Sequence, residues 1–171
     1  MSDRGGIGEP ALAADADGLA TVRIVNVPMA VYILASEHGD ELMRELALIA
    51  ARSRSGGGPD ASAVPVRLTG LVEELRARFS GFTLGPTSAL GEAAGRGDAT
   101  IDVVYTLPRE AGQAASDLGV LLDEADEFCR AGDLLTLSTP PEAVAFRRWF
   151  LGEFARQVDG HPPISWPDWK P

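Results

Sequence analysis

A histidine and two carboxylates lie close enough along the chain to do chemistry together. His38 and Glu41 are three residues apart, and Glu41 and Glu45 are four apart. At these spacings the side chains meet on one face of a helix. Carboxylate and histidine side chains ligate metal ions in four-helix bundles, where Glu-x-x-His motifs from two helices supply the ligands. This cluster is therefore the candidate for a metal or ligand site, and for any catalysis.

The surrounding sequence argues against a metal centre at this cluster. The motif runs His-x-x-Glu, which is the reverse order, and the other histidine, His161, lies between a glycine and a proline. Glu41 belongs to an acidic stretch that is typical of a solvated helix face, whereas His38 falls on the apolar stripe of the same segment. We therefore expect no metal and no cofactor, and we expect His38 to be a buried, hydrogen-bonded structural histidine.

Two arginines and two tryptophans near the C-terminus are the candidates for partner binding. Arg147 and Arg148 can clamp an anion through bidentate contacts, and ion pairs with the chain's own acidic helices are the simpler explanation. Trp166 and Trp169 lie in a proline-rich segment. Because burying tryptophan is strongly favourable, we expect these side chains to pack against an apolar surface. This segment either docks back on the helices, as we expect for Trp166, or binds a partner.

Recognisable nucleophile and nucleotide motifs are missing from the sequence. There is no Gly-x-Ser-x-Gly elbow, no Walker loop and no dinucleotide fingerprint. The single cysteine, Cys129, excludes an internal disulfide and a cysteine-rich zinc site. The sequence therefore favours a protein that is not an enzyme.

The composition favours a protein partner over nucleic acid or a membrane. Among 171 residues, 25 are acidic and 15 basic, which gives a net charge of −10. Nucleic-acid surfaces and polybasic membrane anchors need an excess of Lys and Arg instead. The most apolar stretch, residues 19–35, is interrupted by Arg23, Asn26 and Pro28 and cannot span a bilayer. With no recognisable secretory signal, we expect a cytoplasmic protein that binds another protein or forms a homodimer.

Hydrophobic spacing predicts two strands and four main helices that position these residues. Alternation of apolar and polar residues predicts strands over residues 19–27 and 100–105. Apolar residues three and four apart predict helices over residues 28–52, 65–79, 108–130 and 140–158. Proline suits the first turn of each of these helices. A stop is expected at Ser80-Gly81, followed by a weak helix over residues 87–94.

The two halves of the chain resemble one another in the order of their elements. Each runs strand, long helix, linker and second helix, which gives pseudo-repeats at residues 19–81 and 99–158. When Pro28 is aligned with Pro108, Gly39 falls opposite Gly119. We therefore expect an internal duplication in which the two long helices cross closely at these glycines.

Several segments of the chain also carry a resemblance to a known family. They are residues 41–49 (ELMRELALI), 127–137 (EFCRAGDLLTL), 141–149 (PEAVAFRRW), 160–163 (GHPP) and 166–167 (WP). Together they look like a family of small uncharacterised actinobacterial proteins, often encoded near anti-sigma-factor antagonists, phosphatases and ATP-binding anti-sigma kinases. The resemblance implies a regulatory role in such signalling. It implies no ATP binding, because the chain lacks the Asn-box and the Asp-x-Gly-x-Gly motif of those kinases.

The expected fold is mostly α (α+β), a four-helix arrangement with a small two-stranded antiparallel ribbon. A single helical domain over residues 19–160 follows a flexible tail at residues 1–18 and precedes an extended Pro/Trp tail at residues 161–171. The leading functional expectation is a non-catalytic regulatory or protein-interaction module. The alternative is a small helical-bundle enzyme, or a metal- or ligand-binding protein, that uses His38, Glu41 and Glu45.

Overall fold

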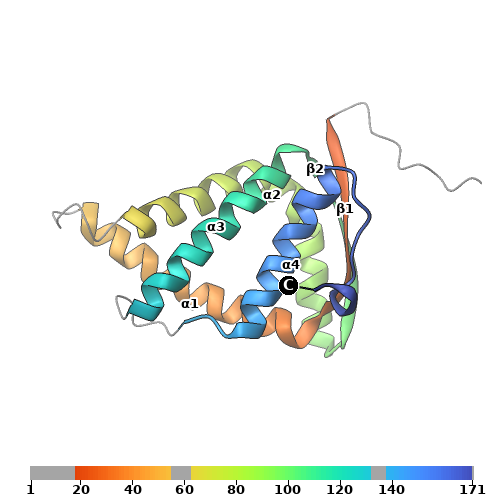
Figure 1. The fold of residues 1–171 in the computed structure, drawn as a ribbon, viewed down its shortest axis with the longest axis horizontal. Coiled ribbons are helices and arrows are strands. Elements are labelled where there is room, and N and C mark those ends of the chain that lie inside the picture. The colour runs from red at the N-terminus through yellow and green to blue at the C-terminus, as the bar shows by residue number, and fades with distance from the viewer. Residues whose placement is uncertain (1–17, 55–62, 132–137, 171) are drawn as a thin grey trace, which may run out of the picture.

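The computed structural model describes residues 18–54, 63–131 and 138–170 (Figure 1). Its elements follow in the order β1 (Leu19–Pro28), α1 (Met29–Arg54), α2 (Ala63–Arg96), β2 (Thr100–Pro108), α3 (Glu110–Ala131), α4 (Pro141–Val158) and a 3-10 turn, η1 (Trp166–Asp168). The protein is mostly α with a two-stranded antiparallel sheet, as the sequence predicts. The predicted flexible tail lies, except for its last residue, outside the described residues.

The two strands form a ribbon with one irregularity. Ile24 lies opposite Val103, and the register then shifts before Val27. Within this bulge Asn26 has a φ of 57°, a left-handed conformation that asparagine tolerates better than most residues. The Asp102 carboxylate accepts a hydrogen bond of 2.8 Å from the Asn26 N–H. The side chain thus satisfies a backbone donor at the irregularity.

One face of the ribbon packs against the helices and forms the main core. The alternation of the strands buries Val22, Ile24, Val27, Val103, Tyr105 and Leu107 on this face. Helix α4 adds Phe146, Trp149 and Phe154 to the same core. A second apolar cluster of buried residues consists of Leu42, Leu46, Leu68, Leu121, Ala125 and Cys129. Of the helices in the described ranges, none combines the length and the apolar character needed to cross a membrane.

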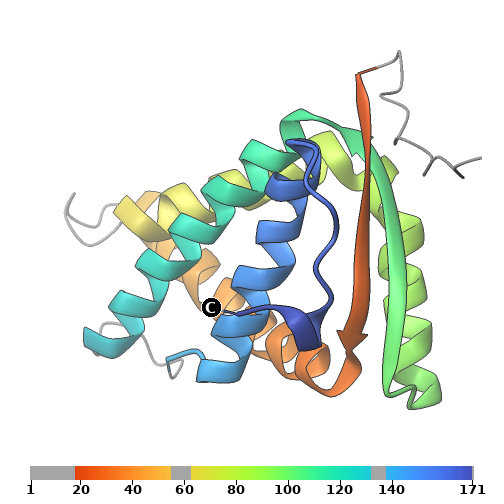
Figure 2. The same cartoon turned by 45° about the vertical axis from the view of Figure 1, so that its right-hand side comes forward.

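Helix α2 is continuous where the sequence predicts two helices with a stop between them. The predicted segments 65–79 and 87–94 belong to one helix, which contains Pro86. A proline inside a helix removes a backbone donor and displaces the carbonyl four residues earlier. Figure 2 shows that the two ends of α2 run in different directions, with the later part beside β2. Burial of Leu90 and Ala93 there outweighs the weak local helix propensity.

The long helices α1 and α3 do not cross at Gly39 and Gly119, so this expectation is wrong. A Cβ on Gly39 would have no atom within 4 Å, and one on Gly119 would meet Leu151 of α4 at 3.8 Å. The reason is that α1 and α3 each pack against α2 and α4. The order β-α-α occurs twice along the chain, while the internal duplication itself stays a prediction.

The C-terminal segment docks on the protein's own body. The Trp166 ring lies 5.9 Å from Phe146 and 5.4 Å from Trp149, measured between ring centroids. Trp169 stacks on Trp166 at 5.9 Å with an interplanar angle of 15°. Both C-terminal tryptophans are half-buried against the main core. The expectation that Trp166 packs on the helices is confirmed.

Polar side chains of α4 fasten this segment in place. The Trp149 indole N–H donates to the Ile164 carbonyl at 2.8 Å, and the Ile164 N–H donates to the Glu153 carboxylate at 2.9 Å. Glu153 is 1% exposed and also accepts hydrogen bonds from Arg156 and Gln157. A buried carboxylate is tolerated when several donors surround it. The docked segment supplies one of these donors.

Candidate functional site

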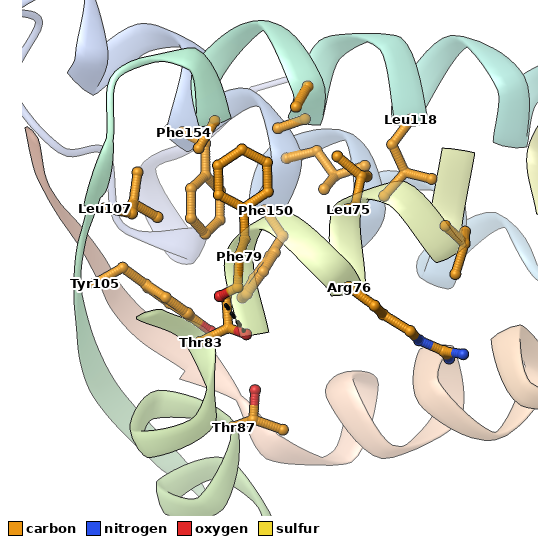
Figure 3. Close-up of a pocket in the computed structure, with 15 residues that line it drawn as sticks. Leu75, Arg76, Phe79, Thr83, Thr87, Tyr105, Leu107, Leu118, Phe150 and Phe154 are labelled. Carbon is orange, nitrogen blue, oxygen red and sulfur yellow. Dashed lines mark hydrogen bonds between the residues drawn. The ribbon is translucent and has the colours of Figure 1, made fainter. Parts of the chain in front are cut away.

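A cavity of about 340 Å³ lies between α2, β2, α3 and α4 (Figure 3). Four aromatic rings contribute to its wall, those of Phe79, Tyr105, Phe150 and Phe154. Aliphatic side chains and alanines complete most of the remainder. This volume falls within the range of small-molecule sites, which are mostly apolar and carry few polar groups.

Beside the cavity, α3 presents small side chains, and it lies closest to α4 at one end. The two helices come together at Gly112, where an added Cβ would lie 3.1 Å from the Val158 Cβ. From that end they separate along their length (Figure 1). On this side of α3 the cavity is lined by Ala111, Ala114 and Ala115, whose short side chains leave space beside the helix. The sequence predicts these alanines as core positions but gives no sign of the space they leave.

Tyr105 is the deeply buried polar residue of this cavity, with an exposed fraction of 4%. Its ring meets Phe154 edge-on, with a centroid distance of 5.0 Å, and Phe150 at 6.4 Å. Burial raises the pKa of the Tyr105 hydroxyl above its ordinary value, with a smaller contribution from Tyr32. The hydroxyl therefore stays protonated at neutral pH. It makes no hydrogen bond to another residue in the part of the chain that the structure describes.

A second cavity, of about 370 Å³, adjoins the first. Leu118, Phe150 and Leu151 line both cavities and lie between them. Helices α1, α3 and α4 form its walls, and its polar members include His38, Thr139 and Arg147. The two cavities therefore share part of their walls.

A polar network borders the second cavity and includes the sequence-predicted His38. The His38 Nε2 lies 2.9 Å from the Thr139 Oγ1, and the Thr139 hydroxyl donates to the Asp126 carboxylate. Because that hydroxyl proton is given to the carboxylate, His38 donates through Nε2. The predicted pairing of His38 with a polar group is confirmed, although the residue is half-buried and not fully buried. A histidine acting on a nucleophile would accept the hydroxyl proton instead.

The metal-ligand candidates are not brought together. Among the described residues, no group of three or more His, Cys, Asp or Glu side chains is arranged to hold a metal ion. His38 is directed to Thr139, and Glu41 is exposed. Glu45 is half-buried and makes interactions of its own.

Arg147 and Arg148 pair with the acidic residues of α3. The Arg147 Nη2 lies 2.5 Å from Asp123 Oδ1 and 2.7 Å from Asp126 Oδ2, and the Arg148 Nη2 lies 3.1 Å from Asp123 Oδ2. The ion pairs expected from the sequence are therefore present. The side chains of Arg147 and Asp126 are 12% and 5% exposed, so this pair is largely removed from water. The partner-binding role of the two arginines and of the C-terminal tryptophans stays a prediction.

Replacing His38 with leucine is expected to lower the free energy of unfolding by no more than about 1 kcal/mol. Leucine matches the apolar lining of the second cavity, and the Thr139 hydroxyl keeps its bond to Asp126. Urea unfolding measures the change. Thr139→Val is the comparison and should be more damaging, because it leaves the buried Asp126 carboxylate without this donor. A His38→Leu loss above about 2 kcal/mol would contradict this account.

Comparisons of the chain with protein-family models, with curated proteins and with solved structures find no match. Membership of the actinobacterial family that the sequence resembles therefore stays a prediction.

Proposed function

We propose that the protein is a ligand-binding regulatory module that takes up a small, largely apolar molecule in the 340 Å³ cavity between α2, β2, α3 and α4. The observation that carries this proposal is the aromatic wall formed by Phe79, Tyr105, Phe150 and Phe154. No described carboxylate, histidine or cysteine lines this cavity. The lining therefore offers binding surface without a general base, which favours a binding role over catalysis.

The expected affinity follows from the apolar surface that a ligand would bury. A molecule that loses about 300 Å² of apolar surface to the cavity gains about 7 kcal/mol. Part of this gain is offset by the loss of translational and rotational freedom. Dissociation constants in the range of about 10 μM to 1 mM are therefore expected for simple apolar compounds.

Cavity filling tests the proposal. N-phenyl-1-naphthylamine, a neutral dye that fluoresces in apolar surroundings, should bind the native chain at one site. Ala114→Phe places a ring in the cavity that Ala114 lines. We expect it to raise the dissociation constant of the dye at least tenfold, which is a loss of about 1.4 kcal/mol of binding free energy. Fluorescence titration and thermal melting measure binding and folding.

Ala77→Phe is the matched control. Ala77 lies on α2, is exposed and does not line the cavity. The same substitution there should leave dye binding unchanged. Equal dye binding by both variants, or no saturable binding by the native chain, would refute the proposed function.

Protein interaction, which the sequence favours, is the second candidate function. It is supported by large apolar side chains that stay exposed, such as Leu84 at 71%, Leu48 at 63% and Val120 at 59%. A role in anti-sigma-factor-type signalling belongs to this candidate. Removal of the C-terminal segment tests whether that segment is available to a partner.

A further inference from the structure

The polar groups around the 340 Å³ cavity differ in what they can offer a ligand. The Thr83 hydroxyl already donates to the Phe79 carbonyl at 3.2 Å. The Arg76 guanidinium is exposed and directed away from the aromatic rings, whereas Tyr105 extends from β2 toward Thr83 (Figure 3). Tyr105 is therefore the buried residue of this cavity that can offer a ligand a donor. Its hydroxyl donates no hydrogen bond to another residue within the described part of the chain. A ligand oxygen placed there would accept a hydrogen bond that no described residue takes.

The cavity is unsuited to a charged ligand. A carboxylate in it would lose its hydration without meeting a cation, because the guanidinium of Arg76 points outward. An ammonium group would likewise meet no carboxylate among the described lining residues. The raised pKa of Tyr105, caused mainly by burial, reflects the same low polarity. The described lining therefore offers a charged ligand no buried partner of opposite charge.

The size and the rings of the cavity favour a flat ligand of two fused rings. A dry cavity of about 150 Å³ holds benzene, and this one is about 340 Å³. The rings of Phe150 and Phe154 are tilted at 5.6 Å, and Tyr105 meets Phe154 edge-on. Aromatic side chains in such arrangements pack well against both the faces and the edges of a planar ring system.

We infer that the ligand of this cavity is an uncharged, ring-containing molecule of bicyclic size with one hydrogen-bond acceptor, which accepts the proton of the Tyr105 hydroxyl. The inference rests on the proposed function and specifies its ligand class. Tyr105 would select a ketone, an ether or a similar neutral oxygen over a pure hydrocarbon.

A pair of isosteric probes tests the inference. 2-Acetylnaphthalene carries a ketone where 2-isopropenylnaphthalene carries a methylene group, and each competes with N-phenyl-1-naphthylamine for the cavity. We expect the native chain to bind the ketone about fivefold more tightly than the alkene. In Tyr105→Phe this preference should fall to nearly none, with the alkene affinity unchanged. 2-Naphthoate should bind at least tenfold more weakly than the ketone, because its charge is unpaired.

Two further measurements keep the test decisive. Thr83→Val is the matched control, because its hydroxyl is already committed to Phe79, and it should retain the preference for the ketone. In the native chain the carbonyl stretching band of bound 2-acetylnaphthalene should shift to lower frequency, which needs no variant. Equal binding of the two neutral probes, or tightest binding of 2-naphthoate, would overturn the ligand class but leave the ligand-binding function standing. Failure of both neutral probes to displace the dye would count against the function itself.

Discussion

Replacing Arg147 with methionine is expected to lower the free energy of unfolding by about 3–5 kcal/mol. Arg147 provides the positive charge beside Asp126, at 2.7 Å, and the Asp126 side chain is 5% exposed. Methionine keeps much of the length and apolar packing of the arginine stem. The loss therefore comes from a carboxylate that stays buried without its counter-charge. Urea unfolding followed by tryptophan fluorescence measures it.

The neighbouring arginine provides a matched control. Arg148 is 57% exposed and pairs with Asp123 at 3.1 Å, so Arg148→Met should cost less than about 1 kcal/mol. Adding Asp126→Leu to Arg147→Met should restore most of the lost stability, because both charges are then gone. Equal effects of the two arginine variants would show that burial of the pair does not govern stability. Lack of recovery in the double variant would assign the loss to packing.

The elements that were predicted from the sequence are those with strong local patterns. Alternation in β1 and β2 reflects burial on one face, so the ribbon could be deduced from residues close together in the chain. The prediction was wrong in α2, where Ser80-Gly81 and Pro86 are local stop signals. Burial of Leu90 and Ala93 against the rest of the core overrides them. Such long-range packing leaves little trace in the local pattern.

The sequence indicated that His38 is hydrogen-bonded, but it did not indicate which residues surround it or where a cavity lies. Placing His38 on an apolar stripe implied that it needs a polar partner, yet Thr139 is 101 residues away along the chain. Asp126 lies in an acidic run, 123–127, a composition typical of a solvated helix face, yet the Asp126 carboxylate is buried. The cavity beside Ala114 depends on how α2, β2, α3 and α4 are placed around it. That geometry is set by the whole fold and not by the composition of any one helix.

Removal of residues 161–171 is expected to destabilise the protein by about 4 kcal/mol. The truncation uncovers Phe146 and Trp149, on which Trp166 packs. It also deprives the Trp149 indole N–H of its acceptor and the buried Glu153 of a backbone donor. For a chain of this size the melting temperature should fall by about 10 °C.

Trp149 reports directly on whether the segment covers it. In a full-length chain with Trp166→Phe and Trp169→Phe, Trp149 is the remaining tryptophan of the three in the sequence. It is 1% exposed in the docked arrangement, so its emission should be blue-shifted and poorly quenched by acrylamide. In the chain that ends at Gly160 the emission should move to longer wavelength and quenching should increase. Thermal melting of both chains supplies the stability difference.

The truncated chain also separates docking within the molecule from binding to a partner. A synthetic peptide of residues 161–171 should raise its melting temperature, because the peptide can restore the hydrogen bonds of Ile164 to Trp149 and Glu153. Millimolar peptide is expected to be needed, since the covalent link otherwise supplies a high effective concentration. If the truncated chain melts where the full chain does, and Trp149 stays shielded, the segment does not stabilise the fold. Its two tryptophans would then be free to bind another protein, and this result would favour the protein-interaction function.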